Sequence, residues 1–314
     1  MGHHAADLTR TTRSDELRDV AVAGHLPRWD RLDRPQHRFD ELLTHRRIIP
    51  NPRTWENRAV PEPMIEIRRA DGRFETRTNW LSSRSSFSFG PHYDPDNVGF
   101  GPLVVHNHEL VNPGTGFDTH PHADAEIVTW VLSGALVHQD SHGHSGIVYP
   151  GLAQRMSAGS GILHSERNDA YRATDGWRVE PARVVEPANY IQMWILPDEA
   201  GLEPSYDQRE VGPDDLAQGW LPIASGSRPD AAITINSSGS TLWTTIMKPG
   251  ESRTLPAAGR RVHLYVARGA ITIEEVGGLA EGDAVRITNA EPLSIAATAD
   301  AELLAWEFFT GEPR

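Results

Sequence analysis

From Met64 onward, short apolar runs rich in Val, Ile, Trp, Phe and Leu are separated by Gly, Pro, Asn and Asp. Such runs, bounded by turn-forming residues, are typical of β-strands. Short strands tend to close into barrels or sandwiches, because closure hides their unpaired edges. We therefore predict an all-β protein with two small β-barrels. The expected strands are residues 64–68, 102–105, 127–131, 135–138, 146–148 and 162–165 in the first half, 190–196 between the halves, and 233–236, 242–247, 262–266, 270–274, 284–287, 293–296 and 302–308 in the second half.

Residues 1–63 lack this pattern, because charged residues and prolines interrupt every apolar run. We expect an irregular extension that is disordered or loosely docked, with short helical turns at 16–23 and 37–48. Met64 opens a strand and looks like a fresh N-terminus, so we also expect the native chain to begin there. The expected domains are the extension 1–63, a first barrel at 64–185 and a second barrel at 186–314.

The composition narrows the range of partners. The 314 residues carry a formal net charge of −13, which disfavours direct binding to nucleic acid or anionic lipid. No run approaches the ~18 apolar residues of a membrane span, and no secretory signal is visible, so we expect a cytoplasmic protein. The absence of cysteine excludes disulfides, iron–sulfur clusters and thiolate catalysis. Any metal must therefore be held by His, Asp or Glu.

Two pairs of candidate metal ligands stand at i, i+2 spacing. His120 and His122 form one pair, and His164 and Glu166 form the other. Residues two apart on a strand point to the same face, so each pair can project both side chains into a barrel. Three imidazoles and one carboxylate suit a divalent Fe, Mn, Co, Ni, Cu or Zn ion. Coordination positions that the protein leaves open would admit O2 or substrate.

The spacing around these residues follows two longer motifs. They are G-x5-H-x-H-x3-E at Gly114, His120, His122 and Glu126, and G-x2-H-x3-N at Gly161, His164 and Asn168. Both resemble the cupin motifs, with two departures: Gly134 falls one residue late, and Gly159 replaces an expected proline. These departures, with HPH, ALVHQDSHGHSG, QRMSAGSGILHSE and QMWILPDEAGLEPSYDQ, resemble the pirin family, and within it the bacterial pirin-like quercetin 2,3-dioxygenases.

The resemblance covers residues 64–314 and implies a bicupin, that is, two β-barrel or jelly-roll domains packed together. It implies one divalent metal, commonly iron, in the N-terminal barrel and none in the C-terminal barrel. The sequence agrees, because His263 is the single histidine of the expected second barrel, residues 186–314, and no H-x-H motif occurs there. We expect His263 to be a hydrogen-bonded packing residue.

The identity of the carboxylate ligand is open between two glutamates. General cupins use the glutamate of the first motif, Glu126, whereas the pirin pattern uses Glu166. Glu166 shares the strand parity of His164, and Glu126 lies four residues beyond His122, roughly 13 Å along a straight strand. We favour Glu166 as the ligand and expect Glu126 to orient neighbouring groups or line the cavity.

The remaining polar residues of the segment have ordinary structural interpretations. The Asp, Ser and Gly of VHQDSHGHSG indicate a hairpin turn, which would leave His142 and His144 facing solvent. His138 and Asp140 are compatible with either the turn or the site. Asn168 is expected to tether the end of the metal-binding strand.

The resemblance implies a dioxygenase that acts on quercetin or a related flavonol with O2 and releases carbon monoxide. Glu166 would accept the proton of the flavonol hydroxyl. The pocket would have to be apolar, with Phe117, Met156, Trp130 and Met193 as candidate walls, although core packing suits Trp130 better. The alternative is a non-catalytic pirin-type regulator that senses metal or redox state and binds a protein partner. Other metal-dependent small-molecule chemistry, such as isomerisation, also occurs on cupin folds.

Overall fold

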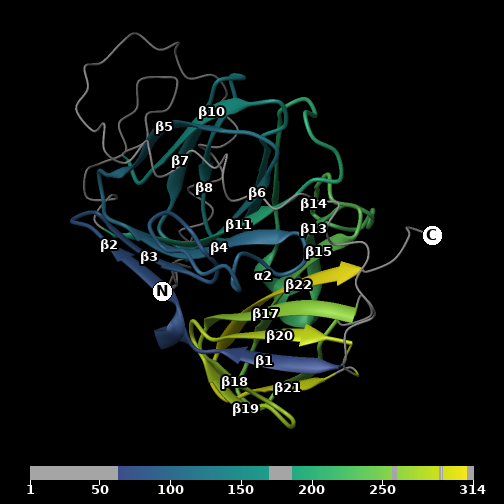
Figure 1. Ribbon diagram of the computed structural model, residues 1–314. Coiled ribbons are helices and arrows are strands. Elements are labelled where there is room, and N and C mark those ends of the chain that lie inside the picture. Colours follow the sequence, from purple (N-terminus) through teal and green to yellow (C-terminus); the bar gives the residue numbers. More distant parts are fainter. Residues whose placement is uncertain (1–62, 170–185, 257–259, 290, 292, 310–314) are drawn as a thin grey trace, which may run out of the picture.

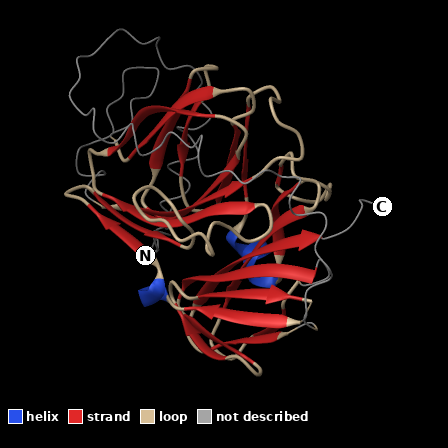
Figure 2. Cartoon of the chain, viewed as in Figure 1, coloured by secondary structure: helices blue, strands red, loops and turns tan. Residues whose placement is uncertain are grey.

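Two sets of strands, each made of one seven-stranded and one four-stranded sheet, form the described part of the protein (Figures 1 and 2). The computed structural model describes residues 63–169, 186–256, 260–289, 291 and 293–309. The expected extension and its helical turns lie outside the described residues. Each pair of sheets encloses its own apolar core, which confirms the prediction of an all-β protein with two barrels.

The first barrel contains the two histidine-bearing strands. Its β6 is apolar on both faces, because one face lines the barrel and the other packs against the second barrel. Its large sheet has the order β12 (Ser205–Glu210), β9 (Leu152–Ser157), β6 (Glu126–Ser133), β11 (Ala188–Ile195), β4 (Leu103–Val111), β3 (Leu81–Ser85), β2 (Phe74–Arg77). Its small sheet has the order β5 (Gly116–His122), β10 (Ile162–Arg167), β7 (Leu136–Asp140), β8 (Ser145–Val148).

The second barrel is filled by aliphatic side chains, among them Leu264, Ile271 and Leu303. Its large sheet has the order β1 (Met64–Arg68), β20 (Ala284–Thr288), β17 (Arg260–Arg268), β22 (Ala301–Phe309), β15 (Ser240–Met247), β13 (Leu221–Ser225), β14 (Ile233–Thr234). Its small sheet has the order β16 (Ser252–Thr254), β21 (Ser294–Ala297), β18 (Ala270–Ile273), β19 (Gly277–Ala280).

The chain crosses between the barrels, so the expected boundary at residue 186 is wrong. Strand β11 lies beyond that boundary but pairs with β6 and β4, and β12 pairs with β9 of the same barrel. Strand β1 was expected in the first barrel, but it pairs with β20 and forms an edge of the second barrel (Figure 1). Residues 64–68 therefore belong to the second barrel and residues 188–210 to the first, the reverse of what their order in the sequence suggests.

The two large sheets face each other across a shared apolar core. Val128 and Trp130 of β6 and Met193 of β11 pack there against Tyr265 and Trp306 of the second barrel. Two indole groups cross this interface. The indole of Trp130 donates a hydrogen bond to Glu302 (2.7 Å), and that of Trp306 lies 3.1 Å from the sulfur of Met193. The preference for core packing at Trp130 is confirmed, whereas Met193 does not line the first barrel.

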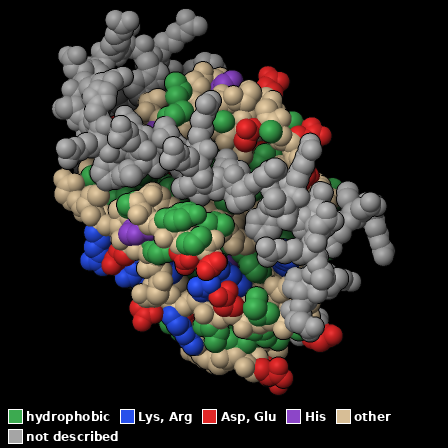
Figure 3. Space-filling view, in the orientation of Figure 1, with side chains coloured by type: hydrophobic (Ala, Val, Ile, Leu, Met, Phe, Trp, Pro, Cys, Tyr) green, Lys and Arg blue, Asp and Glu red, His purple; other side chains and the backbone are tan. Residues whose placement is uncertain are grey.

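Helical structure is sparse in the described part of the chain. It consists of the 3-10 helix η2 (Ala70–Gly72) and the short helix α2 (Pro213–Gln218). Neither could cross a lipid bilayer, and the described residues contain no other helix that could. Acidic and basic side chains mix on the face of the molecule near the junction of the two barrels (Figure 3).

Candidate metal centre

The small sheet of the first barrel gathers the candidate ligands on one face. Strand β10 lies between β5 and β7, with His164 directly opposite His120. Two residues further along their strands, His122 and Glu166 point to the same face. On the other side of β10, Glu166 stands opposite His138 of β7. All five side chains are buried, so the sheet directs them into the barrel.

Three imidazoles converge at this face. The ligand atoms of His120, His122 and His164 all lie within 4.8 Å of one another. Nε2 of His120 and Nε2 of His164 are 3.1 Å apart. Nδ1 of His120 lies 2.7 Å from the backbone carbonyl of Asp118, so Nδ1 carries the proton and Nε2 presents its lone pair to the centre.

The electrostatics keep His164 in the form that binds metal. Burial lowers the pKa of His164 well below its usual value, and the neighbouring imidazoles of His120, His122 and His138 lower it further. Its Nδ1 has no hydrogen-bond partner in the structure. Neutral imidazoles in a buried cluster, next to a carboxylate, form a donor set that fits a divalent transition metal.

Glu166 is almost fully buried, with 2% of its surface exposed. The amide of Gln192 donates a hydrogen bond to one carboxylate oxygen (2.5 Å), and the hydroxyl of Thr129 lies 3.5 Å from the other. Burial raises the pKa of Glu166, although His138 and these hydrogen bonds oppose the rise. Its carboxylate groups with His138 and His164 within 4.8 Å, so His164 belongs to both ligand groups.

His138 is the site residue whose role was ambiguous in the sequence analysis. Its side chain is completely buried, its ring stacks on Tyr206 with centroids 4.8 Å apart, and its Nε2 lies 3.6 Å from Asp140. Burial acts to raise the pKa of Asp140, but the nearby imidazole of His138 and hydrogen bonds from His144 lower it to about 2. The sequence did contain one indication of this position. His138 and Asp140 are two residues apart, so they share one face of β7. His144 is partly exposed and His142 is exposed at the hairpin turn, as expected.

Glu126 lies on the opposite face of its strand from the histidine cluster. It shares the parity of Val128 and Trp130, which face the second barrel, and it belongs to neither ligand group. Its carboxylate accepts hydrogen bonds from the hydroxyl of Ser157 (2.8 Å), and from the backbone N–H (3.1 Å) and side-chain amide (3.0 Å) of Asn236. Glu126 therefore links the first barrel to the second.

Two further residues fix the strands that carry the ligands. The amide of Asn168 donates to the carbonyls of Val111 and Glu186, both at 3.0 Å, which confirms its expected tethering role. At Gly116, a Cβ atom would lie 2.4 Å from the backbone of Glu166 and Arg167. Glycine thus permits the close approach of β5 to β10 at the bulge between His164 and Glu166.

Apolar side chains surround one flank of the cluster. The ring of Trp194 packs edge-on against His122 (centroids 4.7 Å apart) and against Phe89 (5.7 Å). Met156 belongs to the same apolar cluster as Trp194, and Phe117 lies near His120 with ring centroids 6.2 Å apart. The surroundings of the cluster are therefore suited to an aromatic molecule.

Two packed β-barrels, of which the first holds a buried cluster of histidines, define a bicupin with a candidate metal centre. A family model described as Pirin matches residues 67–195, and one described as the quercetinase C-terminal cupin domain matches residues 222–308. The chain belongs to the pirin family.

Several relatives share most of the chain. A Mycobacterium tuberculosis protein, named provisionally as a quercetin 2,3-dioxygenase, is 50% identical over 77% of this chain and 94% of its own. The quercetin 2,3-dioxygenase of Escherichia coli K12 is 36% identical over 78% of this chain and 98% of its own. The crystal structure of Escherichia coli YhhW in complex with nickel(II) has a TM-score of 0.68 and 34% identity, covering 79% of this chain and all of YhhW.

Proposed function

We propose that this protein is a metal-dependent dioxygenase of the quercetin 2,3-dioxygenase type, which cleaves a flavonol or a related polyphenol with O2. The observation that carries the proposal is the convergence of three imidazoles within 4.8 Å, with the buried carboxylate of Glu166 adjoining His164. The names of the relatives support the same reaction class.

In this proposal His120, His122, His164 and Glu166 hold one divalent ion. Iron(II) is the first candidate, with manganese, cobalt, nickel, copper and zinc as alternatives that the same donors accept. Such an ion, when bound, would act as a Lewis acid and lower the pKa of a flavonol hydroxyl.

The residues of the chain orient the substrate and move its proton. Glu166 accepts the hydroxyl proton at a carboxylate oxygen, and burial favours the protonated acid that results. Gln192 and Thr129 hold the carboxylate in place by hydrogen bonds. Trp194 and Met156 provide an apolar flank for the flat rings and exclude water. In the overall reaction both atoms of O2 enter the ring-opened ester, one ring carbon leaves with its own oxygen as carbon monoxide, and Glu166 returns the proton to the carboxylate of the product.

The test combines elemental analysis with aerobic turnover of quercetin, followed by loss of flavonol absorbance and release of carbon monoxide. We expect one metal per chain and turnover in the wild type. His120→Ala, His122→Ala and His164→Ala should each remove most of the metal while circular dichroism shows folded barrels. Stoichiometric metal in all three variants would show that the site is wrong. Bound metal without turnover of any polyphenol would instead favour a regulator that binds a protein partner.

A further inference from the structure

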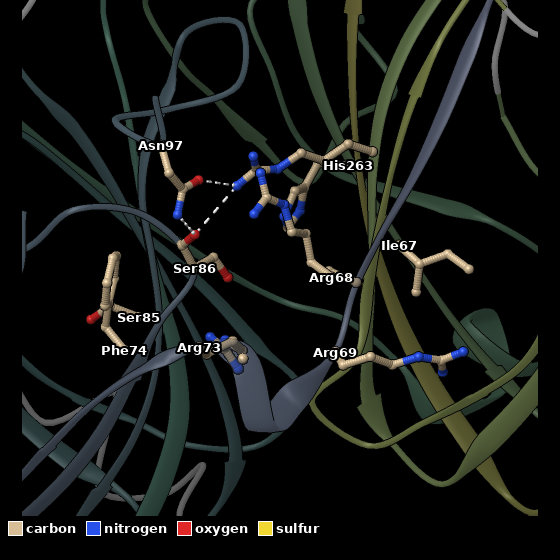
Figure 4. Close-up of a pocket in the computed structure, with 12 residues that line it drawn as sticks. Ile67, Arg68, Arg69, Arg73, Phe74, Ser85, Ser86, Asn97 and His263 are labelled. Carbon is tan, nitrogen blue, oxygen red and sulfur yellow. Dashed lines mark hydrogen bonds between the residues drawn. The ribbon is translucent and has the colours of Figure 1, made fainter. Parts of the chain in front are cut away.

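A second concentration of polar groups lies between the barrels, in a cavity of about 210 Å³ (Figure 4). We call it the arginine pocket and define it by Arg68, Arg73, Arg286, Ser86, Asn97 and His263. Ser86 and Asn97 come from the first barrel, and His263 of β17 and Arg286 of β20 come from the second. Arg68 ends the crossing strand β1, and Arg73 follows η2.

Positive charge in the pocket exceeds negative charge. The lining includes three inward guanidinium groups but no carboxylate. Glu66 lies beside the pocket, 2.6 Å from Arg68 and 3.6 Å from Arg286. Its single negative charge therefore neutralises only one of these two positive charges. Arg73 donates to the phenol oxygen of Tyr265 (2.7 Å) and to the backbone carbonyls of Arg84 and His106. These acceptors are neutral and leave the charge of Arg73 uncompensated.

Arg286 is the most constrained of these cations. Only 4% of its side chain is exposed, and it donates to the side-chain oxygen of Asn97 (2.7 Å) and the carbonyl of Ser86 (3.3 Å). Figure 4 shows Arg68 turned toward Asn97 and Ser86, whereas Arg69 points away, toward its partner Asp283. Burial lowers the pKa of Arg286 to about 10, and the nearby charge of Arg68 contributes. An anion between the two guanidinium groups would relieve this repulsion.

Hydrogen-bond donors without partners point to the same kind of ligand. The Nε atoms of Arg68, Arg73 and Arg286 and the hydroxyl of Ser86 are buried without a hydrogen-bond partner in the structure. His263 was expected to be hydrogen-bonded, but neither of its ring nitrogens has a partner. Buried donors are rarely left unpaired, so a ligand rich in acceptor oxygens would satisfy several of them together.

The chemistry and size of the pocket select the ligand. Guanidinium groups match the geometry of phosphate oxygens and carboxylates. A cavity of about 210 Å³ is smaller than the roughly 300–1,000 Å³ of sites for drug-sized molecules, so it suits a small ion better than a flavonol. We propose that the arginine pocket binds a phosphate dianion, free or as the phosphate group of a small monoester, and that the anion holds the two barrels together.

The test is isothermal titration of the full chain with inorganic phosphate at constant ionic strength. We expect one phosphate per chain, and binding weakened about tenfold or more in Arg68→Gln, because hydrogen bonds to charged groups contribute roughly 1.5–3 kcal/mol each. Arg77→Gln is the matched control. It removes the same charge from an exposed residue that pairs with Glu75 outside the pocket, and should leave affinity unchanged.

Glu66→Gln gives a prediction of opposite sign. It removes the carboxylate that competes for Arg68 and Arg286, so phosphate should bind several-fold more tightly, which a merely damaged fold would not produce. Titration with glycerol 3-phosphate separates the two sources, since tighter binding than phosphate indicates a monoester and weaker binding indicates the free ion. Absence of saturable binding into the millimolar range, or equal losses in Arg68→Gln and Arg77→Gln, would overturn the proposal.

Discussion

Replacing Glu126 by Gln tests whether this residue links the two barrels or takes part in the candidate metal centre. The carboxylate accepts hydrogen bonds from Ser157 and from two groups of Asn236. In the variant, rotation of the Asn236 amide can restore the pairings with residue 126, at the cost of its 3.3 Å bond to Ser157, so most of the loss arises from the missing charge. Hydrogen bonds to charged groups contribute about 1.5–3 kcal/mol and neutral ones about 0.5–1.5 kcal/mol. The difference is about 1–1.5 kcal/mol per bond, so across three bonds we expect the free energy of unfolding to fall by about 3–4.5 kcal/mol.

Metal content should follow the opposite pattern. Glu126→Gln should keep the metal, because its side chain faces the second barrel. Glu166→Gln should lose much of the metal and all turnover, because it removes a ligand and the proposed base. Burial raises the pKa of Glu166, so its metal-free form should be no less stable than the metal-free wild type.

The assay pairs elemental analysis with urea unfolding of metal-free protein, because bound metal would itself stabilise the folded state. Each variant thereby reports on both properties. Metal lost from Glu126→Gln and retained in Glu166→Gln would refute the assignment and restore the general cupin pattern. Unchanged stability in Glu126→Gln would show that the bridge contributes nothing.

Three further predictions concern pH, strand packing and the second barrel. Burial raises the pKa of Glu109 to about 7 from 4.5, so stability should fall as pH rises between these values, by about 3 kcal/mol in total. Urea unfolding at pH 5 and pH 8 should show this loss in the wild type and much less of it in Glu109→Gln. Gly116→Ala should force β5 from β10 and weaken metal affinity, measured by chelator competition. Gly278→Ala, at a glycine of β19 where an added Cβ would meet no atom within 4 Å, serves as the control. His263→Ala should leave metal content unchanged in elemental analysis and cost about 0.5–3 kcal/mol of stability; two metals per wild-type chain, with one lost in this variant, would contradict it.

The i, i+2 spacing of His120 with His122, and of His164 with Glu166, was sufficient to predict that these residues share a barrel face. The position of Glu126 was harder to predict. Both faces of β6 are buried, so its sequence is almost continuously apolar and does not tell which face lines the first barrel. That distinction depends on the second barrel, which packs against one face only.

Long-range pairings left weaker traces in the sequence. Strand β1 was predicted as a strand, but nothing in its five residues indicates that its partner is β20. The arginine pocket was not predicted, because Arg68 and Arg286 become neighbours only through that pairing. The role of His138 was ambiguous because the end of a strand and the following turn lie in the same short polar segment, so the residue could belong to either.

The exchange of β1 between the barrels has a consequence for how the chain folds during synthesis. Arg69, next to this strand, and its partner Asp283 are 214 positions apart in the chain. At translation rates of about 5–20 residues per second, β1 leaves the ribosome roughly 10–40 s before β20 exists. Through that interval Ile65 and Ile67 have no strand to pair with, and the charges of Glu66 and Arg68 between and beside them discourage pairing with other nascent chains. The second barrel can therefore close only after β20 has been synthesised, although its edge strand β1 is the first of the described strands to be made.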